Sequence, residues 1–298
     1  MKKLYIDCSM GAAGDMLTGA LLELMPDRSE AVARLNSIGI PGVRYEVADS
    51  TKCGVSGTHV TVTYKGMEEI TQDVDIPEED LPVAQAAMEE GMQGHPHHDH
   101  EHGSHHDHAH EHDHAHRTLA DIEEIIYSLK LPESVREDVI GVYEIIAEAE
   151  GIAHDEPASE VHFHEVGSMD AVADAAAVCL LMNEIMPDAV AVSDIHVGAG
   201  HVMCAHGLLP VPAPATRNIL AGLPTYGGEV QGELCTPTGA ALLKYFGTEF
   251  GADREKFEAG GAVTESGHGM GRKDFDRPNC VTVLLKSQLP TACRSGGL

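Results

Sequence analysis

The sequence predicts an α/β fold in which helices flank a mixed sheet, with a disordered histidine-rich insertion near the middle of the chain. Short apolar or β-branched runs are typical of strands, and they occur at 3–8, 43–49, 58–65, 189–197, 224–230 and 279–285. Segments with helical periodicity or helix-capping residues lie between them, at 15–25, 28–37, 118–130, 133–150, 169–185, 214–221 and 240–247. Strands that alternate with helices favour a sheet covered by helices.

A turn of small residues links the first predicted strand to the first predicted helix. Asp7 lies near the end of the strand, Gly11 and Gly14 lie in the turn, and Asp15 opens the helix. Glycine lets a backbone approach a ligand, and open α/β sheets bind ligands at the carboxyl ends of their strands. The turn could therefore hold a phosphate or a metal, or it could be a plain connection. It is not a P-loop, because no Gly-Lys-Ser/Thr follows.

The composition changes abruptly at 95–116, after an acidic stretch at 66–94 with a weak helical pattern at 78–92. Residues 95–116 contain twelve histidines and five carboxylates. A segment with so few apolar side chains cannot bury a core, so we expect it to be mobile. Neutral imidazole binds nickel, copper and zinc, which predicts a role in acquiring or buffering metal rather than in catalysis, since catalysis requires fixed geometry. A pH-responsive linker is the alternative.

Two helices are predicted after the histidine-rich tract, at 118–130 and 133–150. Thr118 and Asp121 have the spacing of a capping box for the helix at 118–130. Apolar side chains on one face of each helix predict that both pack against the core.

The stretch 161–174 concentrates groups that could bind a metal. On an extended segment, His162 and His164 would point to the same side, beside Glu165. Ser168 can cap the next helix, on which Asp170 and Asp174 share a face. Imidazoles and carboxylates together suit borderline divalent metals, and a helix N-terminus favours a phosphate. In the alternative interpretation, these side chains only cap and solvate the helix.

Further candidate ligands follow the next strands. Asp194 and His196 alternate near the end of the strand 189–197, and His201 and His206 lie in the loop that follows. Thr236 is a predicted helix cap, with Thr238 in the first turn, where free N–H groups could bind an anion.

The glycine-rich stretch at 267–274 is expected to be a mobile loop, and it carries His268, Arg272 and Lys273. The two basic residues could clamp a phosphate, or they could belong to a solvated turn. Residues after the final strand show no pattern and are expected to form a tail.

Composition excludes several classes of function. The 298 residues carry a formal net charge of -29, which argues against binding nucleic acid or an anionic membrane. No apolar run is long enough to cross a bilayer, and none resembles a signal sequence at the N-terminus. The seven cysteines form no Cys-x-x-Cys pair, so we expect a protein of the reducing cytoplasm.

Several motifs together resemble one known family over roughly residues 1–286. They are Asp-Cys-Ser-Met-Gly-Ala-Ala-Gly-Asp-Met at 7–16, the internal histidine-rich tract, His-Phe-His-Glu-Val-Gly at 162–167, Thr-Pro-Thr-Gly at 236–239 and Gly-His-Gly-Met-Gly at 267–271. The chain is similar to the nickel-insertion proteins of nickel-pincer cofactor biosynthesis. Each motif alone is weak, but the combination is specific.

The resemblance implies a CTP-dependent cyclometallase, a nickel chelatase of the lyase class. It would insert Ni²⁺ into pyridinium-3,5-bisthiocarboxylic acid mononucleotide, forming two Ni–S bonds and one Ni–C bond, and its product would serve lactate racemase and related enzymes. CTP would act with Mg²⁺ or Mn²⁺, and the protein is expected to be a homo-oligomer. Family members often continue into a C-terminal domain that binds CTP. Because this sequence stops at Leu298, that domain is expected to be a separate polypeptide, or the chain to be a fragment.

This interpretation assigns candidate roles to individual residues. Forming a Ni–C bond requires loss of a ring proton, so His164 or Glu165 is the predicted general base. The candidate metal ligands are Asp7, Asp15, His162, His164, Glu165, Asp170, His196, His201 and His206. The candidate substrate- or nucleotide-binding residues are Gly11, Gly14, Ser168, Thr236, Thr238, His268 and Arg272.

The expected organisation is an N-terminal α/β part at 1–94, the histidine-rich loop at 95–116, the rest of the α/β core with the site at 117–286, and a tail at 287–298. Two other functions remain open. A non-catalytic nickel store or delivery protein would need only the histidine-rich tract. A metal-dependent phosphohydrolase would use Asp7, Asp15, His162 and Asp170.

Overall fold

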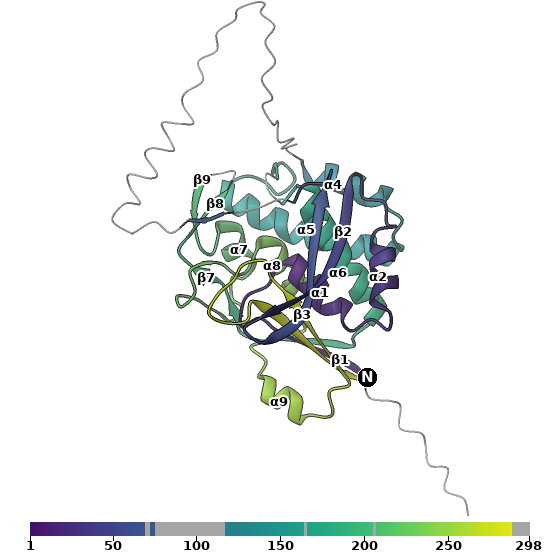
Figure 1. Cartoon of the computed structure of the whole chain (residues 1–298). Coiled ribbons are helices and arrows are strands. Elements are labelled where there is room, and N and C mark those ends of the chain that lie inside the picture. Colours follow the sequence, from purple (N-terminus) through teal and green to yellow (C-terminus); the bar gives the residue numbers. More distant parts are fainter. Residues whose placement is uncertain (69–71, 75–116, 164–165, 205–206, 288–298) are drawn as a thin grey trace, which may run out of the picture.

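A seven-stranded mixed sheet forms the centre of the computed structural model, which describes residues 1–68, 72–74, 117–163, 166–204 and 207–287 (Figure 1). Its strands lie in the order β12-β5-β1-β14-β13-β3-β2. Their bounds are β1 (Lys2–Asp7), β2 (Val43–Lys52), β3 (Val55–Tyr64), β5 (Ala189–Val192), β12 (Glu249–Phe250), β13 (Glu265–Met270) and β14 (Cys280–Ser287). The predicted α/β class with a mixed sheet is confirmed.

The sheet combines strands from both sides of the histidine-rich tract. β1 is parallel to β5 and antiparallel to β14, and β13 is antiparallel to β14 and parallel to β3. β2 and β3 form a hairpin whose turn residues, Cys53 and Gly54, both have positive φ, as tight hairpin turns require. The segments at 1–68 and 117–287 therefore share one sheet and one hydrophobic core.

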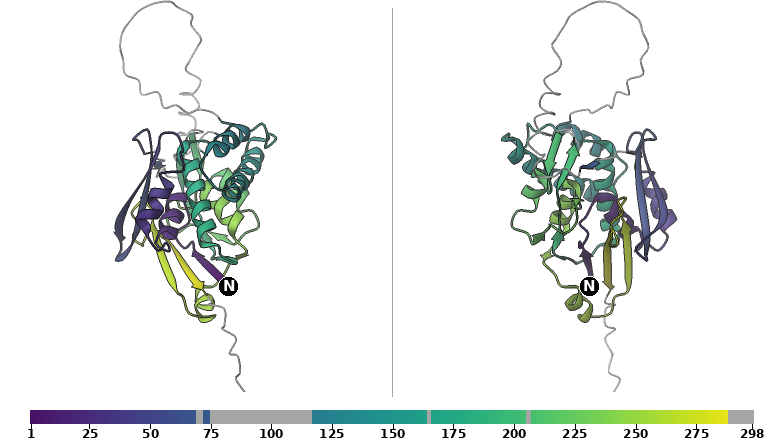
Figure 2. Two further views of the ribbon diagram at one scale, coloured as in Figure 1. Left: turned by 90° about the vertical axis from the view of Figure 1, so that its right-hand side faces the viewer. Right: turned by 60° about the vertical axis from the view of Figure 1, so that its left-hand side comes forward.

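Helices are stacked on the sheet in successive layers (Figure 2). α1 packs against β3, β13 and β14 and also against α6; α6 packs against α5, and α5 against α7 and α8. The helices are α1 (Gly14–Leu22), α2 (Arg28–Leu35), α4 (Leu119–Ser128), α5 (Glu133–His154), α6 (Met169–Ile185), α7 (Pro214–Ile219), α8 (Pro237–Phe246) and α9 (Arg254–Ala259). The alanine-rich α6 is buried on nearly all sides.

The predicted helix caps are confirmed. The Thr118 side chain accepts a hydrogen bond from the Asp121 amide, and the Asp121 carboxylate accepts one from the Thr118 amide, completing the capping box of α4. The Ser168 side chain caps α6 by accepting from the Ala171 amide, and the Thr236 side chain caps α8 by accepting from the Gly239 amide. Ser168 and Thr236 thereby fix the N-termini of α6 and α8, two helices whose first residues line the candidate functional site.

The described residues form three small sheets in addition to the seven-stranded one. β4 (Gln72–Val74), β8 (His201–Cys204) and β9 (Gly207–Pro210) form a three-stranded antiparallel sheet. Two short pairs complete the described strands: β6 (Ile195–His196) with β10 (Thr225–Tyr226), and β7 (Gly198–Ala199) with β11 (Gly232–Glu233).

Several local predictions were wrong. The strand expected at 224–230 is only the two-residue β10, because two glycines follow it and its partner β6 is equally short. The strand expected at 189–197 is divided into β5 and β6 by Ser193, whose hydroxyl accepts a hydrogen bond from the Cys8 amide.

Two other boundaries differ from the prediction. His268 lies within β13 rather than in a loop, since β13 pairs with β14 along its whole length. The final strand includes Lys286, whose side chain is buried, and ends at Ser287. The predicted helical pattern at 78–92, the histidine-rich loop and the tail from 288 lie outside the described residues.

No helix among the described segments combines the length and apolar character that crossing a membrane requires.

Candidate functional site

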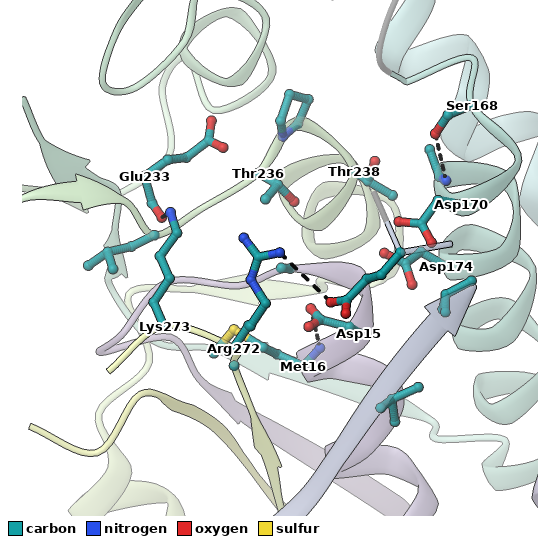
Figure 3. Close-up of a pocket in the computed structure, with 18 of the residues that line it drawn as sticks. Asp15, Met16, Ser168, Asp170, Asp174, Glu233, Thr236, Thr238, Arg272 and Lys273 are labelled. Carbon is teal, nitrogen blue, oxygen red and sulfur yellow. Dashed lines mark hydrogen bonds and ion pairs between the residues drawn. The ribbon is translucent and has the colours of Figure 1, made fainter. Parts of the chain in front are cut away.

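A pocket of about 230 Å³ lies where the N-termini of three helices converge (Figure 3). Ala13, Asp15 and Met16 from the start of α1 line it, as do Ser168, Asp170, Ala171 and Asp174 from α6, and Thr236, Pro237 and Thr238 from α8. Each helix N-terminus carries partial positive charge and free N–H groups, so all three favour a bound anion.

The pocket also contains side chains of both charges. Its lining includes five carboxylates and two cations, so acidic residues outnumber basic ones. The carboxylates are those of Asp15, Glu68, Asp170, Asp174 and Glu233, and the cations are Arg272 and Lys273. One ligand with both anionic groups and a bound divalent metal would suit this mixture.

Asp174 is held against the start of α1. Its carboxylate accepts a hydrogen bond from the backbone N–H of Asp15, and Gly14 permits this approach because a Cβ at that position would overlap the carboxylate. The other oxygen, Oδ1, is buried and has no hydrogen-bond partner among the described residues. A buried carboxylate oxygen without a partner costs stability, which is typical of a group kept for binding.

Burial also changes the acidity of this cluster. Desolvation raises the pKa of Asp174 well above its usual range, and the charges of Asp170 and Asp15 raise it further. Burial likewise raises the pKa of Asp15, although the Met16 amide, His59 and Arg272 act in the opposite direction. The pocket therefore resists carrying its full negative charge.

This shift predicts a dependence of stability on pH. Because the pKa of Asp174 is higher in the folded state than in the unfolded state, its contribution to the free energy of unfolding falls as pH rises above about 4. We expect Asp174→Asn to become more stable than the wild type as pH rises, by on the order of 1 kcal/mol at pH 7. Urea denaturation between pH 4 and pH 8 measures this. The exposed control Asp276→Asn should follow the wild-type curve, and a difference that shrinks with rising pH would contradict the prediction.

Both cations of the pocket follow β13 and are already paired. The ammonium of Lys273 lies 2.6 Å from Asp73 Oδ2 and donates to the carbonyl of Glu233 at 3.1 Å. Arg272 Nη1 lies 3.8 Å from Glu68 Oε1, the pair marked by a dashed line in Figure 3. Asp73 comes from β4, the last described strand before the histidine-rich tract.

Several residues singled out in the sequence meet at this pocket. They come from four distant segments of the chain and are Asp15, Ser168, Asp170, Thr236, Thr238 and Arg272. Gly14 permits the contact with Asp174, and Gly11, with φ +75, lies close to the backbone of Leu234. These two glycines shape the structure around the pocket without lining it.

Other predicted ligands lie elsewhere. Asp7 forms an ion pair with Arg254 at 3.5 Å, and His162 is exposed. His196 is buried against the ring of Tyr226, with a centroid separation of 4.5 Å.

His201 lies in β8 and pairs in register with Val74 of β4. His268 shares a hydrogen bond with the hydroxyl of Thr282 at 2.9 Å. Neither lines the pocket. His164, Glu165 and His206 lie outside the described residues.

The candidate metal ligands that the structure describes do not all lie in one place. Among residues 1–68, 72–74, 117–163, 166–204 and 207–287, no group of three or more His, Cys, Asp or Glu side chains is arranged to hold a metal ion. Each of three candidates is engaged with a different neighbour: Asp7 pairs with Arg254, His196 packs against Tyr226, and His201 pairs in register with Val74. Of the four residues proposed for a phosphohydrolase, Asp15 and Asp170 line the pocket, whereas Asp7 pairs with Arg254 and His162 is exposed.

Sequence reasoning missed part of the pocket. The helical spacing of Asp170 and Asp174 was a usable signal, since it places both on one face of α6. Glu68 and Asp73 carried no such signal, because they meet Arg272 and Lys273 across about 200 residues of sequence.

A mixed sheet with a small charged pocket at helix N-termini defines an α/β protein built to bind small polar ligands. The family model described as nickel insertion protein matches residues 4–295, and the chain belongs to that family.

Curated relatives agree with this assignment. The chain is 36% identical over 290 residues to a pyridinium-3,5-bisthiocarboxylic acid mononucleotide nickel insertion protein of Clostridium kluyveri, covering 97% of this chain and 63% of the relative. It is 32% identical over 286 residues to a protein of the same name from Geobacillus kaustophilus, covering 96% of this chain and 60% of the relative. The chain thus spans about three fifths of the length of these relatives. No solved structure matches it.

Proposed function

We propose that this chain carries out nickel insertion into pyridinium-3,5-bisthiocarboxylic acid mononucleotide, and that the pocket at the three helix N-termini is where nickel and substrate meet. The observation that carries the proposal is the pocket itself, which sets two cations beside a cluster of carboxylates in a chain of the nickel insertion family. The substrate named for the relatives has a phosphate, two thiocarboxylates and a ring, and it must receive a divalent cation.

The two kinds of charge suit different parts of that reaction. Arg272, Lys273 and the N–H groups at the start of α8 can bind the phosphate. Asp15, Asp170 and Asp174 create a negative field that attracts Ni²⁺ to their part of the pocket. Carboxylates are hard ligands and sulfur is soft, so the thiocarboxylates can take nickel from this side to form two Ni–S bonds.

Formation of the Ni–C bond releases the ring proton, which a base must accept. We assign this step to His164 or Glu165, which follow Phe163, a buried residue at the entry to α6. The ring carbon keeps the electron pair of its C–H bond and shares it with nickel, while the proton moves to the base.

The remaining parts of the proposal concern the whole protein. They are dependence on CTP with Mg²⁺ or Mn²⁺, binding of CTP by a C-terminal domain or separate chain, delivery of the product to lactate racemase-type enzymes, homo-oligomerisation and a cytoplasmic location. They rest on family membership and on the cysteine pattern.

Insertion in vitro tests the proposal directly. The chain is incubated with Ni²⁺, CTP, Mg²⁺ and the bisthiocarboxylate mononucleotide, with and without the C-terminal part of a relative supplied separately. Mass spectrometry of the nucleotide should show one nickel gained and the ring proton lost. If the chain forms no nickel adduct even with the C-terminal part present, while the full-length relative does, the proposal is wrong.

A nickel store is the second candidate, and the twelve histidines at 95–116 favour it. Deletion of 95–116 separates the two functions. We expect the shortened chain to keep its insertion rate at saturating Ni²⁺. When Ni²⁺ is limiting, its rate should be about tenfold lower than that of the wild type, because it lacks the imidazoles that raise the local metal concentration. Replacing 95–116 by a Gly/Ser linker of equal length is the control for chain length. Equal loss at both nickel concentrations would contradict the delivery role.

A further inference from the structure

The two cations of the pocket are paired with carboxylates from a single stretch of chain. Asp73 lies 2.6 Å from Lys273 and Glu68 lies 3.8 Å from Arg272, and both belong to the segment between β3 and the histidine-rich tract. We call these two side chains the resident carboxylates. Arg272 and Lys273 are the only cationic residues in the lining of the described pocket, so both of its positive side chains have a partner of opposite charge.

Neither ion pair is deeply buried. The side chains of Lys273 and Asp73 are 25% and 29% exposed, and those of Arg272 and Glu68 are 34% and 37% exposed. Partly exposed ion pairs of this kind contribute little to stability, because water screens the charges. A phosphate can replace them with charge-assisted hydrogen bonds to both cations, which are stronger.

Glu68 also has an unfavourable neighbour. Its carboxylate lines the same pocket as the carboxylate of Asp15, and the two like charges repel each other. Moving Glu68 into solvent would relieve this repulsion. Asp73 would not be left without a partner either, because it also accepts a hydrogen bond from the Glu233 amide at 3.1 Å. Replacement of the two carboxylates by a phosphate therefore leaves no buried charge without a partner.

We propose that Arg272 and Lys273 form a phosphate-binding site whose resident carboxylates, Glu68 and Asp73, occupy it in the free protein and give way to the phosphate of the ligand. The proposal deepens the proposed function and rests on it, since it assigns the phosphate end of the mononucleotide to this side of the pocket. Asp73 and Glu68 thereby set a threshold for anion binding: a ligand must outcompete them, which disfavours ligands without a dianionic group.

Calorimetric titration with inorganic phosphate and with nicotinate mononucleotide tests the exchange. Removing a resident carboxylate should tighten binding, so the Kd should fall by about two- to fivefold for Asp73→Asn or Glu68→Gln and by about tenfold for the double variant. Lys273→Met should weaken binding by more than tenfold. Asp49→Asn is the matched control, because Asp49 also pairs with an arginine, at 2.8 Å, but is 83% exposed and lies outside the pocket lining.

The outcomes separate this inference from the proposed function. The mononucleotide could bind the wild type while Asp73→Asn, Glu68→Gln and Lys273→Met leave its Kd unchanged. The phosphate would then bind elsewhere, and this inference would be wrong while the proposed function would stand. If Lys273→Met weakens binding but the carboxylate variants do not tighten it, the exchange is also wrong. If the wild type binds neither probe while remaining folded, the placement of the substrate in this pocket falls as well.

Discussion

Replacing Asp15 and Asp174 together by asparagine is expected to lower the rate of nickel insertion by about a hundredfold. Both carboxylates line the pocket, and Asp174 has a buried oxygen that no described residue satisfies. The double variant keeps the size of the side chains but removes two ionisable carboxyl groups from the part of the pocket that would attract Ni²⁺. Binding of the mononucleotide should persist, since Arg272 and Lys273 are unchanged.

A control variant is needed to separate the effect of the electric field within the pocket from the effect of the net charge of the whole protein. Glu124→Gln with Glu137→Gln also removes two negative charges, at exposed positions of α4 and α5. Insertion rates measured at limiting Ni²⁺, with circular dichroism to confirm folding, should fall for the pocket variant and not for the surface variant. Equal rates in the two variants would show that nickel does not use this pocket.

The second large effect concerns stability. Gly269→Ala is expected to lower the free energy of unfolding by about 3 kcal/mol or more. Gly269 lies in β13 directly beneath α1, and a Cβ there would overlap the carbonyl oxygen of Met16 and approach the Ala20 amide to 2.6 Å. Both obstacles are backbone atoms of a buried helix, so α1 would have to lift from the sheet.

Because α1 carries Asp15, the same displacement should also lower the rate of nickel insertion. Gly260→Ala is a suitable control, since the nearest atom to its added Cβ is 3.4 Å away and its φ is negative. Chemical denaturation of both variants measures the difference. A loss below 1 kcal/mol for Gly269→Ala would mean that the close packing of α1 on β13 is not required.

Local features of the fold were predictable from the sequence. The caps at Thr118, Ser168 and Thr236 follow short-range rules, and the side chains form the expected hydrogen bonds. The glycine turn before α1 was also identified, although its role in admitting Asp174 was not. Predictions failed where an element depends on its neighbours: His268 joined a strand because β14 and β3 pair with β13 on either side.

The candidate site was only partly predictable for the same reason. Asp15, Asp170, Thr236 and Arg272 were all named from local motifs, but nothing in those motifs showed that the four would meet. His196 had the same kind of motif support, yet it packs against Tyr226 away from the pocket. A side chain's type is local information, whereas its partners depend on how strands are ordered.

By itself, the sequence determined the α/β class, the helix starts and the family resemblance, since these depend on residue types at short spacing. Only the tertiary structure decided that α1, α6 and α8 begin at one pocket and that Asp73 and Glu68 neutralise its cations. Contacts between residues far apart in the chain arise from strand order and helix packing, and no periodicity within one segment encodes them.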